Sequence, residues 1–294
     1  GTKIEGILVD DNGLQIDRKR YSYEKNYLSG IETVKKLVDE FDKLSNQICT
    51  VGIGIPGFSS KETGLVTNAN SMWLNDKPFK KDLEIALNRK VKLMNDANCF
   101  TLSEAVDGAG KDYQSIFGII VGTGFGGALS YKKEIIEGAN QIAGDWGHQP
   151  LPYPTKEEIE TKINCPSMNC GRPLCAEQFM SGIGFKDVFN QKHKTNFTSE
   201  EIAKLDLDGD PRANSELSLY EDRMARLLAV MIGIFDPDAI ILGGGMSNID
   251  RFYINIPTLI PKYTFSNKVK TKVLKNFHGD SSGVRGAAWL WNNV

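Results

Sequence analysis

Asp96 is the carboxylate of this sequence best placed for general-base chemistry. It follows an apolar segment, residues 91–94, and stands beside Asn95, with Asn98 two positions further on. An aspartate with an ordinary pKa of about 3.9 cannot deprotonate a free alcohol, but it can orient a hydroxyl and take its proton as the oxygen attacks a phosphoryl group. Aspartate at a helix start is also a common N-terminal cap. The position fits either a catalytic base or a cap.

A histidine and three cysteines form a second candidate site. Cys165, Cys170 and Cys175 lie close together, and His148 precedes them. One imidazole and three thiolates complete a closed tetrahedral Zn²⁺ site, which is structural rather than catalytic in type. The odd total of five cysteines disfavours a framework of disulfides. The spacing predicts a structural zinc site, and the alternative is three unrelated free thiols.

Glycine-rich turns mark three places where the backbone could approach a phosphate. They are residues 122–127 (Gly-Thr-Gly-Phe-Gly-Gly), 243–245 (Gly-Gly-Gly) and 1–3 (Gly-Thr-Lys). A dinucleotide-binding fingerprint needs a helix directly after its glycines, whereas a strand is predicted after Gly127. Bare backbone N–H groups and the Thr123 hydroxyl can bind phosphates instead, although any one turn could equally be free of ligand. The three turns together predict a nucleotide-binding cleft.

The elements that must position these residues alternate between strands and helices. Apolar and β-branched runs predict strands at residues 4–8, 48–55, 91–94, 115–121, 128–131 and 239–242. Helical periodicity predicts helices at residues 29–44, 99–106, 217–231 and 284–291. Each half begins with a strand and hairpin, which predicts two related α/β domains around a cleft. We expect a small domain (1–114), a larger one with the zinc-binding loop (115–283), and a C-terminal helix (284–294) that packs back on the first.

The composition is that of an ordinary globular protein and disfavours several classes. The 294 residues include 35 Lys and Arg against 37 Asp and Glu, a net charge of −2. A charge this close to zero disfavours binding to nucleic acid or to an anionic membrane. No apolar run approaches the ~18 residues of a membrane span, and no signal peptide opens the sequence. We therefore expect a cytoplasmic protein with neither nucleic-acid nor membrane partners.

Together these motifs resemble the ROK (repressor, open reading frame, kinase) family over essentially the whole chain. The matching segments are Gly1-Thr2-Lys3, Asn95-Asp96-Ala97-Asn98, Gly122-Thr123-Gly124, the Gly-x-x-Gly-His ending at His148, Cys170-Gly171 with Cys175-x-Glu177, and Gly243-Gly244-Gly245. Residues 68–75, 147–152 and 278–291 are most similar to enterobacterial-type fructokinases, also called mannofructokinases. The resemblance implies an α/β fold of the actin-like ATPase (ribonuclease H-like) type, with duplicated domains and an interdomain cleft.

The resemblance also implies ligands and the residues that bind them. It implies ATP, Mg²⁺ and a structural Zn²⁺ as cofactors, a hexose as substrate, a homodimer as assembly, and Asp96 as catalytic base. The implied sugar-binding residues are Gly57, Asn70, Asn95, Asp145, His148 and Glu177. The implied nucleotide-binding residues are Thr2, Lys3, Gly122, Thr123, Gly124, Gly126, Gly127, Gly243 and Gly244. The metal ligands are again His148, Cys165, Cys170 and Cys175.

Three departures from the family pattern affect these assignments. The family's Asp-x-Gly-Gly-Thr-Lys is present only from its second glycine, so we expect that residues are missing in front of Gly1. The family's Glu-x-Gly-His has Asp145 in place of the glutamate, a carboxylate shorter by one methylene group. The usual Cys-x-Cys-Gly has Met168 in place of its first thiol, so Cys165 must reach the zinc from a longer loop.

The expected function is ATP-dependent phosphorylation of a hexose, with D-fructose converted to D-fructose 6-phosphate by a fructokinase. Two alternatives stay open. The first is an N-acetylhexosamine (N-acetylglucosamine) kinase of the same family, because residues 95–100 suit either sugar. The second is a sugar-responsive ROK transcriptional repressor. We do not expect the repressor, because no helix-turn-helix segment precedes Gly1 and no basic helix is typical of groove binding.

Overall fold

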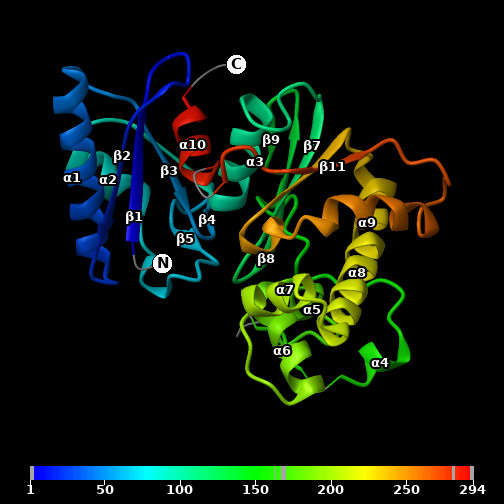
Figure 1. The fold of residues 1–294 in the computed structure, drawn as a ribbon. Coiled ribbons are helices and arrows are strands. Elements are labelled where there is room, and N and C mark those ends of the chain that lie inside the picture. Colours follow the sequence, from blue (N-terminus) through cyan, green and yellow to red (C-terminus); the bar gives the residue numbers. More distant parts are fainter. Residues whose placement is uncertain (1–2, 162, 167–169, 280–281, 292–294) are drawn as a thin grey trace.

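The fold consists of two lobes joined through two central helices (Figure 1). It is described by a computed structural model for residues 3–161, 163–166, 170–279 and 282–291. We call residues 3–95 the N-terminal lobe and residues 115–275 the C-terminal lobe. Helix α3 (Asp96–Val106) contacts strands of both lobes, and helix α10 (Ser282–Trp289) packs along it. The first and last parts of the described chain therefore lie side by side.

The N-terminal lobe is built from paired strands covered by two helices. Its elements are β1 (Lys3–Val9), β2 (Gln15–Ser22), α1 (Tyr27–Ser45), β3 (Val51–Ile55), β4 (Phe58–Ser59), β5 (Val66–Thr67), η1 (Met72–Leu74), α2 (Phe79–Leu87) and β6 (Val91–Asn95). Strands β1 and β2 pair antiparallel, β4 and β5 form a hairpin, and β3 and β6 pair in parallel. The buried faces of α1 and α2 pack on β3 and β6, so the carboxyl ends of these two strands are held together.

The C-terminal lobe contains a five-stranded sheet in the order β11-β10-β7-β8-β9. Its strands are β7 (Ser115–Val121), β8 (Phe125–Tyr131), β9 (Glu134–Ile136), β10 (Ala239–Gly243) and β11 (Lys272–Lys275). Its helices are α4 (Lys156–Ile159), α5 (Ala176–Met180), α6 (Gly182–His193), α7 (Ser199–Leu207), α8 (Pro211–Phe235), η2 (Gly245–Asn248), α9 (Arg251–Leu259) and η3 (Ile260–Lys262). Helices α4 to α7 gather at one end of the lobe (Figure 1). A large aromatic and aliphatic core joins them to the sheet.

A buried carboxylate ties α3 to the C-terminal segment. Glu104 is fully buried, and its oxygens accept hydrogen bonds from the backbone N–H of Phe277, at 3.0 Å, and from the Ser282 hydroxyl, at 2.7 Å. One turn further along, Asp107 pairs with Arg285, and the Nε–Oδ2 distance is 2.8 Å. Because an unpaired buried charge is costly, these contacts fix the position of α3 relative to α10.

Most strands and helices lie where the sequence predicts them, and two boundaries differ in ways that affect the site. Helix α3 begins at Asp96 rather than at residue 99, because Asn95 provides its cap. Strand β8 begins at Phe125, so Gly126 and Gly127 lie in a strand and not in the turn. A side chain at Gly127 would collide with Phe117, which gives this glycine a packing role. Within the described ranges, no helix is both long and apolar enough to cross a bilayer.

Candidate active site

Asp96 lies at the junction of β6 and α3 and is exposed to solvent. The capping role falls mainly to its neighbour, because Asn95 Oδ1 accepts the Ala97 N–H at 2.9 Å. Asp96 Oδ1 accepts the same N–H at 2.8 Å, which leaves the second carboxylate oxygen for another partner. Although solvent reaches this side chain, surrounding protein excludes much of the bulk water and raises the pKa of the carboxyl above its ordinary value, against the lowering effect of the backbone hydrogen bonds.

The amide of Asn95 also joins the active-site strand to its parallel neighbour. Asn95 Nδ2 donates to the carbonyl oxygen of Gly57, at 3.0 Å, just after the end of β3. Gly57 has a φ of +71°, and a side chain there would collide with the carbonyl of Thr67. Only glycine fits this turn without strain, because its φ is positive and the neighbouring backbone is too close for a Cβ. The turn therefore holds residues 67–69 next to Asn95.

The predicted sugar ligand Asn70 follows this segment and is exposed. A second asparagine fixes its position: Asn75 Oδ1 accepts the N–H of Ala69 at 2.9 Å, and Asn75 Nδ2 donates to the Ala69 carbonyl at 3.0 Å. The Asn75 side chain thus pairs with Ala69 as a neighbouring strand would. Sequence reasoning did not assign Asn75 a role, although it ends a segment that matches the family. Gly57, Asn70 and Asn95 form one wall of the candidate site, which we call the N-terminal wall.

The opposite wall begins with the loop of residues 137–148, which two glycines hold against β8. Gly144 has a φ of +87°, and a Cβ there would lie 2.6 Å from the Cα of Ala128. A Cβ at Gly147 would collide with the carbonyl oxygen of Phe125. The loop can lie this close to the strand only because both positions lack a side chain. This close packing sets the path of the backbone into His148.

Between those glycines, Trp146 anchors the loop and turns its neighbours outward. Its ring packs against Phe117 and Phe125, with both centroid distances at 4.9 Å, and the residue is buried. The predicted sugar ligand Asp145 is exposed, and His148 is half-buried. The buried Trp146 thus attaches the loop to the core, while its neighbour Asp145 faces solvent.

Glu177 completes the second wall, which we call the C-terminal wall, together with Asp145 and His148. It lies in the first turn of α5 and is mostly buried, and its N–H donates to the carbonyl of Gly147 at 2.8 Å. Its Oε2 accepts the N–H of Phe125 at 3.2 Å, directly after the glycine turn. The same oxygen would lie 3.3 Å from a Cβ at Gly124. Glu177 therefore connects the predicted sugar-binding loop with the predicted phosphate-binding turn.

The predicted metal ligands come together in the structure. The ligand atoms of His148, Cys165, Cys170 and Cys175 all lie within 4.8 Å of one another. Cys175 Sγ is 3.5 Å from Cys170 Sγ and 3.5 Å from His148 Nδ1. A tetrahedral zinc with ordinary bond lengths requires about 3.8 Å between two sulfurs and about 3.6 Å between sulfur and nitrogen. The cluster is therefore close to the geometry that Zn²⁺ needs, and Nδ1 is the imidazole atom that faces it.

The environment of the thiols also suits a cation. Burial alone would raise the pKa of the Cys170 thiol, but hydrogen bonds, first of all from the Arg172 backbone, bring it below its ordinary value. Burial raises the pKa of Cys175. Because thiols bind metal as thiolates, a bound cation would stabilise the ionised form of both. Met168, which replaces the family's first thiol, lies outside the described residues.

The glycine turn between β7 and β8 is tight and open to solvent. The N–H of Gly122 donates to the carbonyl of Gly124 at 3.0 Å, and Thr123 at its tip is exposed. The carbonyl of Gly122 accepts the N–H of Gly182, the first residue of α6, at 2.7 Å. No atom would meet a Cβ at Gly122, so the space beside the turn is available to a ligand.

The second predicted nucleotide turn lies next to the first because β10 pairs in parallel with β7. Gly243 is in register with Ile120, and Gly244, with a φ of +82°, would bring a Cβ to 2.5 Å from the carbonyl of Val121. The structure thus brings two of the three glycine turns together at the carboxyl ends of adjacent strands, where open α/β sheets bind ligands. Lys3 opens β1 and is exposed, whereas Thr2 lies outside the described residues.

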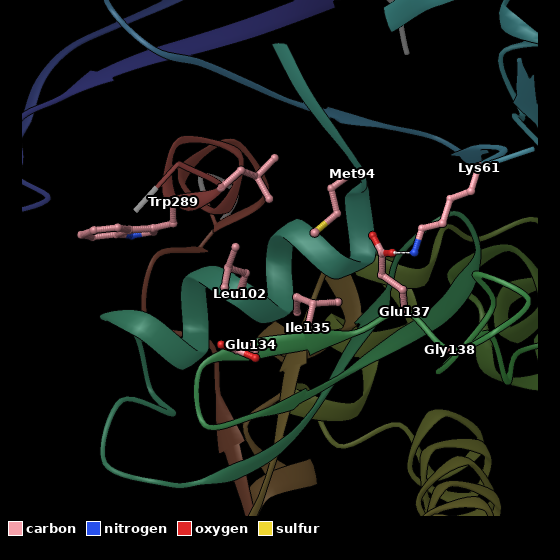
Figure 2. A pocket seen from close by; sticks show the side chains of 9 residues that line it. Lys61, Met94, Leu102, Glu134, Ile135, Glu137, Gly138 and Trp289 are labelled. Carbon is pink, nitrogen blue, oxygen red and sulfur yellow. Dashed lines mark ion pairs between the residues drawn. The ribbon is translucent and has the colours of Figure 1, made fainter. Parts of the chain in front are cut away.

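A cavity of about 420 Å³ has a different set of lining residues (Figure 2). It opens between α3, β9 and α10, and its lining residues are Lys61, Met94, Leu102, Glu134, Ile135, Glu137, Gly138, Trp289 and Leu290. None of the predicted catalytic, sugar-binding, nucleotide-binding or metal-ligating residues lines it. The site geometry rests on the strand ends and loops described above, and not on this cavity.

Comparisons with known proteins agree with this architecture. The model of the ROK family matches residues 1–294. The chain is 35% identical over 291 residues to an N-acetyl-D-glucosamine kinase of Vibrio cholerae, which covers 99% of this chain and 96% of that protein. A similar solved structure is a ROK hexokinase from Thermus thermophilus, with a TM-score of 0.81 and 21% identity, which covers 97% of this chain and 96% of the other. Another is a ROK family glucokinase from Streptomyces griseus in complex with glucose and AMPPNP, with a TM-score of 0.80 and 23% identity, which covers 98% of this chain and 96% of the other.

The predicted fold class, an α/β fold of the actin-like ATPase type, is confirmed by these neighbours, whose similarity extends over nearly the full length of both chains. The family predicted from the motifs is confirmed as well. The curated relatives do not support the narrower expectation of a fructokinase. The chain therefore belongs to the ROK family, as a sugar kinase.

Proposed function

We propose that this protein transfers the terminal phosphoryl group of ATP to the 6-hydroxyl of N-acetyl-D-glucosamine. The observation that carries the phosphotransfer is Asp96, a carboxylate at a strand end that solvent reaches and whose pKa is raised. The choice of sugar rests on the relatives, several of which are named N-acetyl-D-glucosamine kinases and match over 99% of this chain. They favour the N-acetylhexosamine alternative over fructose.

In this proposal Asp96 accepts the proton of the attacking hydroxyl. Its raised pKa makes it a stronger base than an ordinary aspartate. Asn95 fixes the carboxylate indirectly, since its side chain holds both the start of α3 and the Gly57 turn. The turns at 122–124 and 243–244 would offer backbone N–H groups to the phosphates of ATP, which would carry Mg²⁺ to offset the charge on the phosphate oxygens.

The C-terminal wall would bind the sugar hydroxyls through Asp145, His148 and Glu177. We propose that His148, Cys165, Cys170 and Cys175 hold a structural Zn²⁺ that fixes this wall. Because His148 Nδ1 faces the thiols, its Nε2 stays available for a hydroxyl. A closed site of three thiolates and one imidazole has no open position for a substrate, so the metal would order the loop and take no part in the phosphotransfer.

The test is a coupled assay of the purified protein with ATP and a panel of sugars: N-acetylglucosamine, N-acetylmannosamine, glucose, mannose and fructose. We expect kcat/KM for N-acetylglucosamine to exceed that for fructose by about tenfold or more, since a site built for a polar substituent rejects sugars that lack it. Asp96→Asn, assayed in parallel, measures any contaminating kinase. A higher kcat/KM for fructose would restore the fructokinase interpretation, and no turnover of any sugar would contradict the kinase proposal.

A further inference from the structure

We propose that Gln141 is a positioning residue that couples the two walls of the sugar-binding site. The inference rests on the proposed function only in that it assumes a hexose bound between these walls, whichever hexose that is. Gln141 belongs to the loop that carries Asp145 and His148, but its side chain bonds to the N-terminal lobe, next to the strand that begins after Gly57.

The contact consists of two hydrogen bonds that use both ends of one carboxamide. Gln141 Nε2 donates to the carbonyl oxygen of Ser59 at 3.1 Å, and Gln141 Oε1 accepts the N–H of Lys61 at 3.0 Å. Ser59 and Lys61 flank a single residue, so the carboxamide occupies the place that a peptide group of a neighbouring strand would take. Of the twenty side chains, only Asn and Gln carry a neutral donor and acceptor in this arrangement.

The loop that carries Gln141 is shaped to deliver this contact. Gln141 has a φ of +57°, a left-handed conformation that costs free energy for a residue with a Cβ. The turn is closed below it, where the N–H of Ala143 donates to the carbonyl of Glu137 at 3.2 Å. Gly144, three residues after Gln141, is packed against β8. A displacement of the Gln141 tip is therefore transmitted through a short, folded segment to Asp145.

The partner on the N-terminal lobe is equally close to its own site residues. Ser59 ends β4, which starts directly after the Gly57 turn, and β4 pairs with β5, which leads into Asn70. Ser60, the residue between Ser59 and Lys61, closes the hairpin, because its N–H donates to the carbonyl of Leu65 at 2.9 Å. Gln141 thus bridges the hairpin between Gly57 and Asn70 to the loop in front of Asp145 and His148.

A second contact crosses the same gap and differs in kind. Lys61 and Glu137 form an ion pair at the rim of the cavity shown in Figure 2. Their side chains are 65% and 32% exposed, and an ion pair this exposed to water contributes little. The coupling therefore depends on Gln141, and Lys61→Met, which keeps the Lys61 N–H, provides a matched comparison across the same gap.

The first test compares Gln141→Met with the wild type, using the hexose that the wild type phosphorylates best. Methionine keeps the length of the side chain and removes both hydrogen bonds. We expect KM for the sugar to rise about 5- to 30-fold, with kcat within about twofold, because the contact touches no reacting atom and should therefore affect the ground and transition states alike. KM for ATP should stay within about twofold. Gln47→Met, at an exposed position after α1, and Lys61→Met should both leave the sugar KM within about twofold.

The second test uses Gln141→Glu to separate coupling from a general loss of structure. An ionised carboxylate accepts the Lys61 N–H but opposes the Ser59 carbonyl, whereas a protonated one can donate to it and restore both bonds. The sugar KM of Gln141→Glu relative to the wild type should therefore fall as the pH is lowered from 8 towards 5. A merely unfolded loop would show no such recovery.

The outcomes decide the inference separately from the proposed function. If Gln141→Met leaves the sugar KM unchanged, or lowers kcat and not affinity, the coupling role is wrong, whichever sugar is the substrate. If Lys61→Met raises the sugar KM as much as Gln141→Met does, the neutral contact is not the coupling element. If the wild type prefers fructose, the proposed substrate is wrong, while the ratio of mutant to wild-type KM for fructose still tests Gln141.

Discussion

The two walls of the candidate site are built in different ways. The N-terminal wall, with Gly57, Asn70 and Asn95, lies near strand ends. It is held by the pairing of β3 with β6 and by hydrogen bonds from the Asn95 and Asn75 side chains to neighbouring backbone. The C-terminal wall, with Asp145, His148 and Glu177, lies on a loop and a short helix outside the regular sheet. It depends on close glycine contacts, on the proposed zinc cluster and on Gln141.

This difference indicates that the two walls contribute differently to the proposed reaction. The pairing of β3 with β6 places Asp96, the proposed base, at the end of a strand whose position the N-terminal core fixes. Asp145, His148 and Glu177, which we propose to recognise the sugar, lie on segments that the sheet does not fix, and other contacts hold these segments in place. We therefore expect a change of Asp96 to affect the reaction itself, and changes in the C-terminal wall to affect mainly sugar binding. The following predictions test that contrast, from the largest expected effect to the smallest.

The sharpest test on the N-terminal side is Asp96→Asn. We expect kcat to fall by about 10²- to 10⁴-fold, the usual contribution of a general base, while the variant still binds ATP and sugar as measured by calorimetry. Asn keeps the hydrogen bond to the Ala97 N–H, so α3 should keep its start. A variant with more than about a tenth of the wild-type kcat would contradict the assignment of Asp96.

On the C-terminal side the corresponding test is removal of the proposed zinc. We expect one zinc per chain by elemental analysis, and Cys165→Ser or Cys170→Ser should lose it and raise the sugar KM by about 10- to 100-fold, with a smaller change in kcat. Cys49→Ser, outside the cluster, is the matched control. Absence of zinc from the wild type, or zinc retained in Cys165→Ser, would contradict this ligand set.

The pH dependence distinguishes the two walls within one protein. A base must be ionised to act, so kcat at saturating sugar should fall by about tenfold per pH unit as the pH drops below the pKa of Asp96. Surrounding protein raises that pKa, so the fall should begin at a higher pH than an ordinary aspartate would give. Loss of zinc at acidic pH would appear in KM instead. A kcat that stays constant down to the ordinary pKa of an aspartate would show that Asp96 is not the limiting base.

The smallest predicted effect comes from Asn75→Ala, which removes the two hydrogen bonds that hold Ala69. Because neighbouring backbone contacts remain, we expect the free energy of unfolding to fall by about 1–2 kcal/mol and the sugar KM to rise only a few-fold. Asn267→Ala, at an exposed position near η3, should change neither quantity. A large fall in kcat would show that the N-terminal wall is not as self-supporting as the structure indicates.

The same contrast explains how far the sequence could predict the site. The apolar run before Asp96 and the glycines after β7 are local patterns, so strand ends and turns could be placed from them, with errors of a few residues such as the start of β8 at Phe125. The clustering of His148 with Cys175 was predictable because few residue types form such a donor set. These features are properties of single short segments.

The contacts between distant segments could not be predicted in this way. Gln141 pairs with Ser59, 82 positions earlier in the chain, and an isolated glutamine in a loop has no pattern that indicates a partner. The role of Asn75 depends on a turn that brings its side chain back to Ala69. Such contacts follow from the three-dimensional path of the chain, and polar side chains that mimic a peptide group leave no periodicity in the sequence.

The burial of Glu104 has a consequence for how the chain reaches its folded state. The Ala109 N–H donates to this carboxylate locally, at 2.9 Å, whereas its donors Phe277 and Ser282 lie more than 170 residues downstream. The indole of Trp291 likewise donates to the carbonyl of Val51 on β3, at 2.7 Å. During synthesis the first lobe therefore leaves the ribosome well before the residues that complete it. Helix α3 can therefore form its contacts with Phe277 and Ser282 only after the end of the chain has been made.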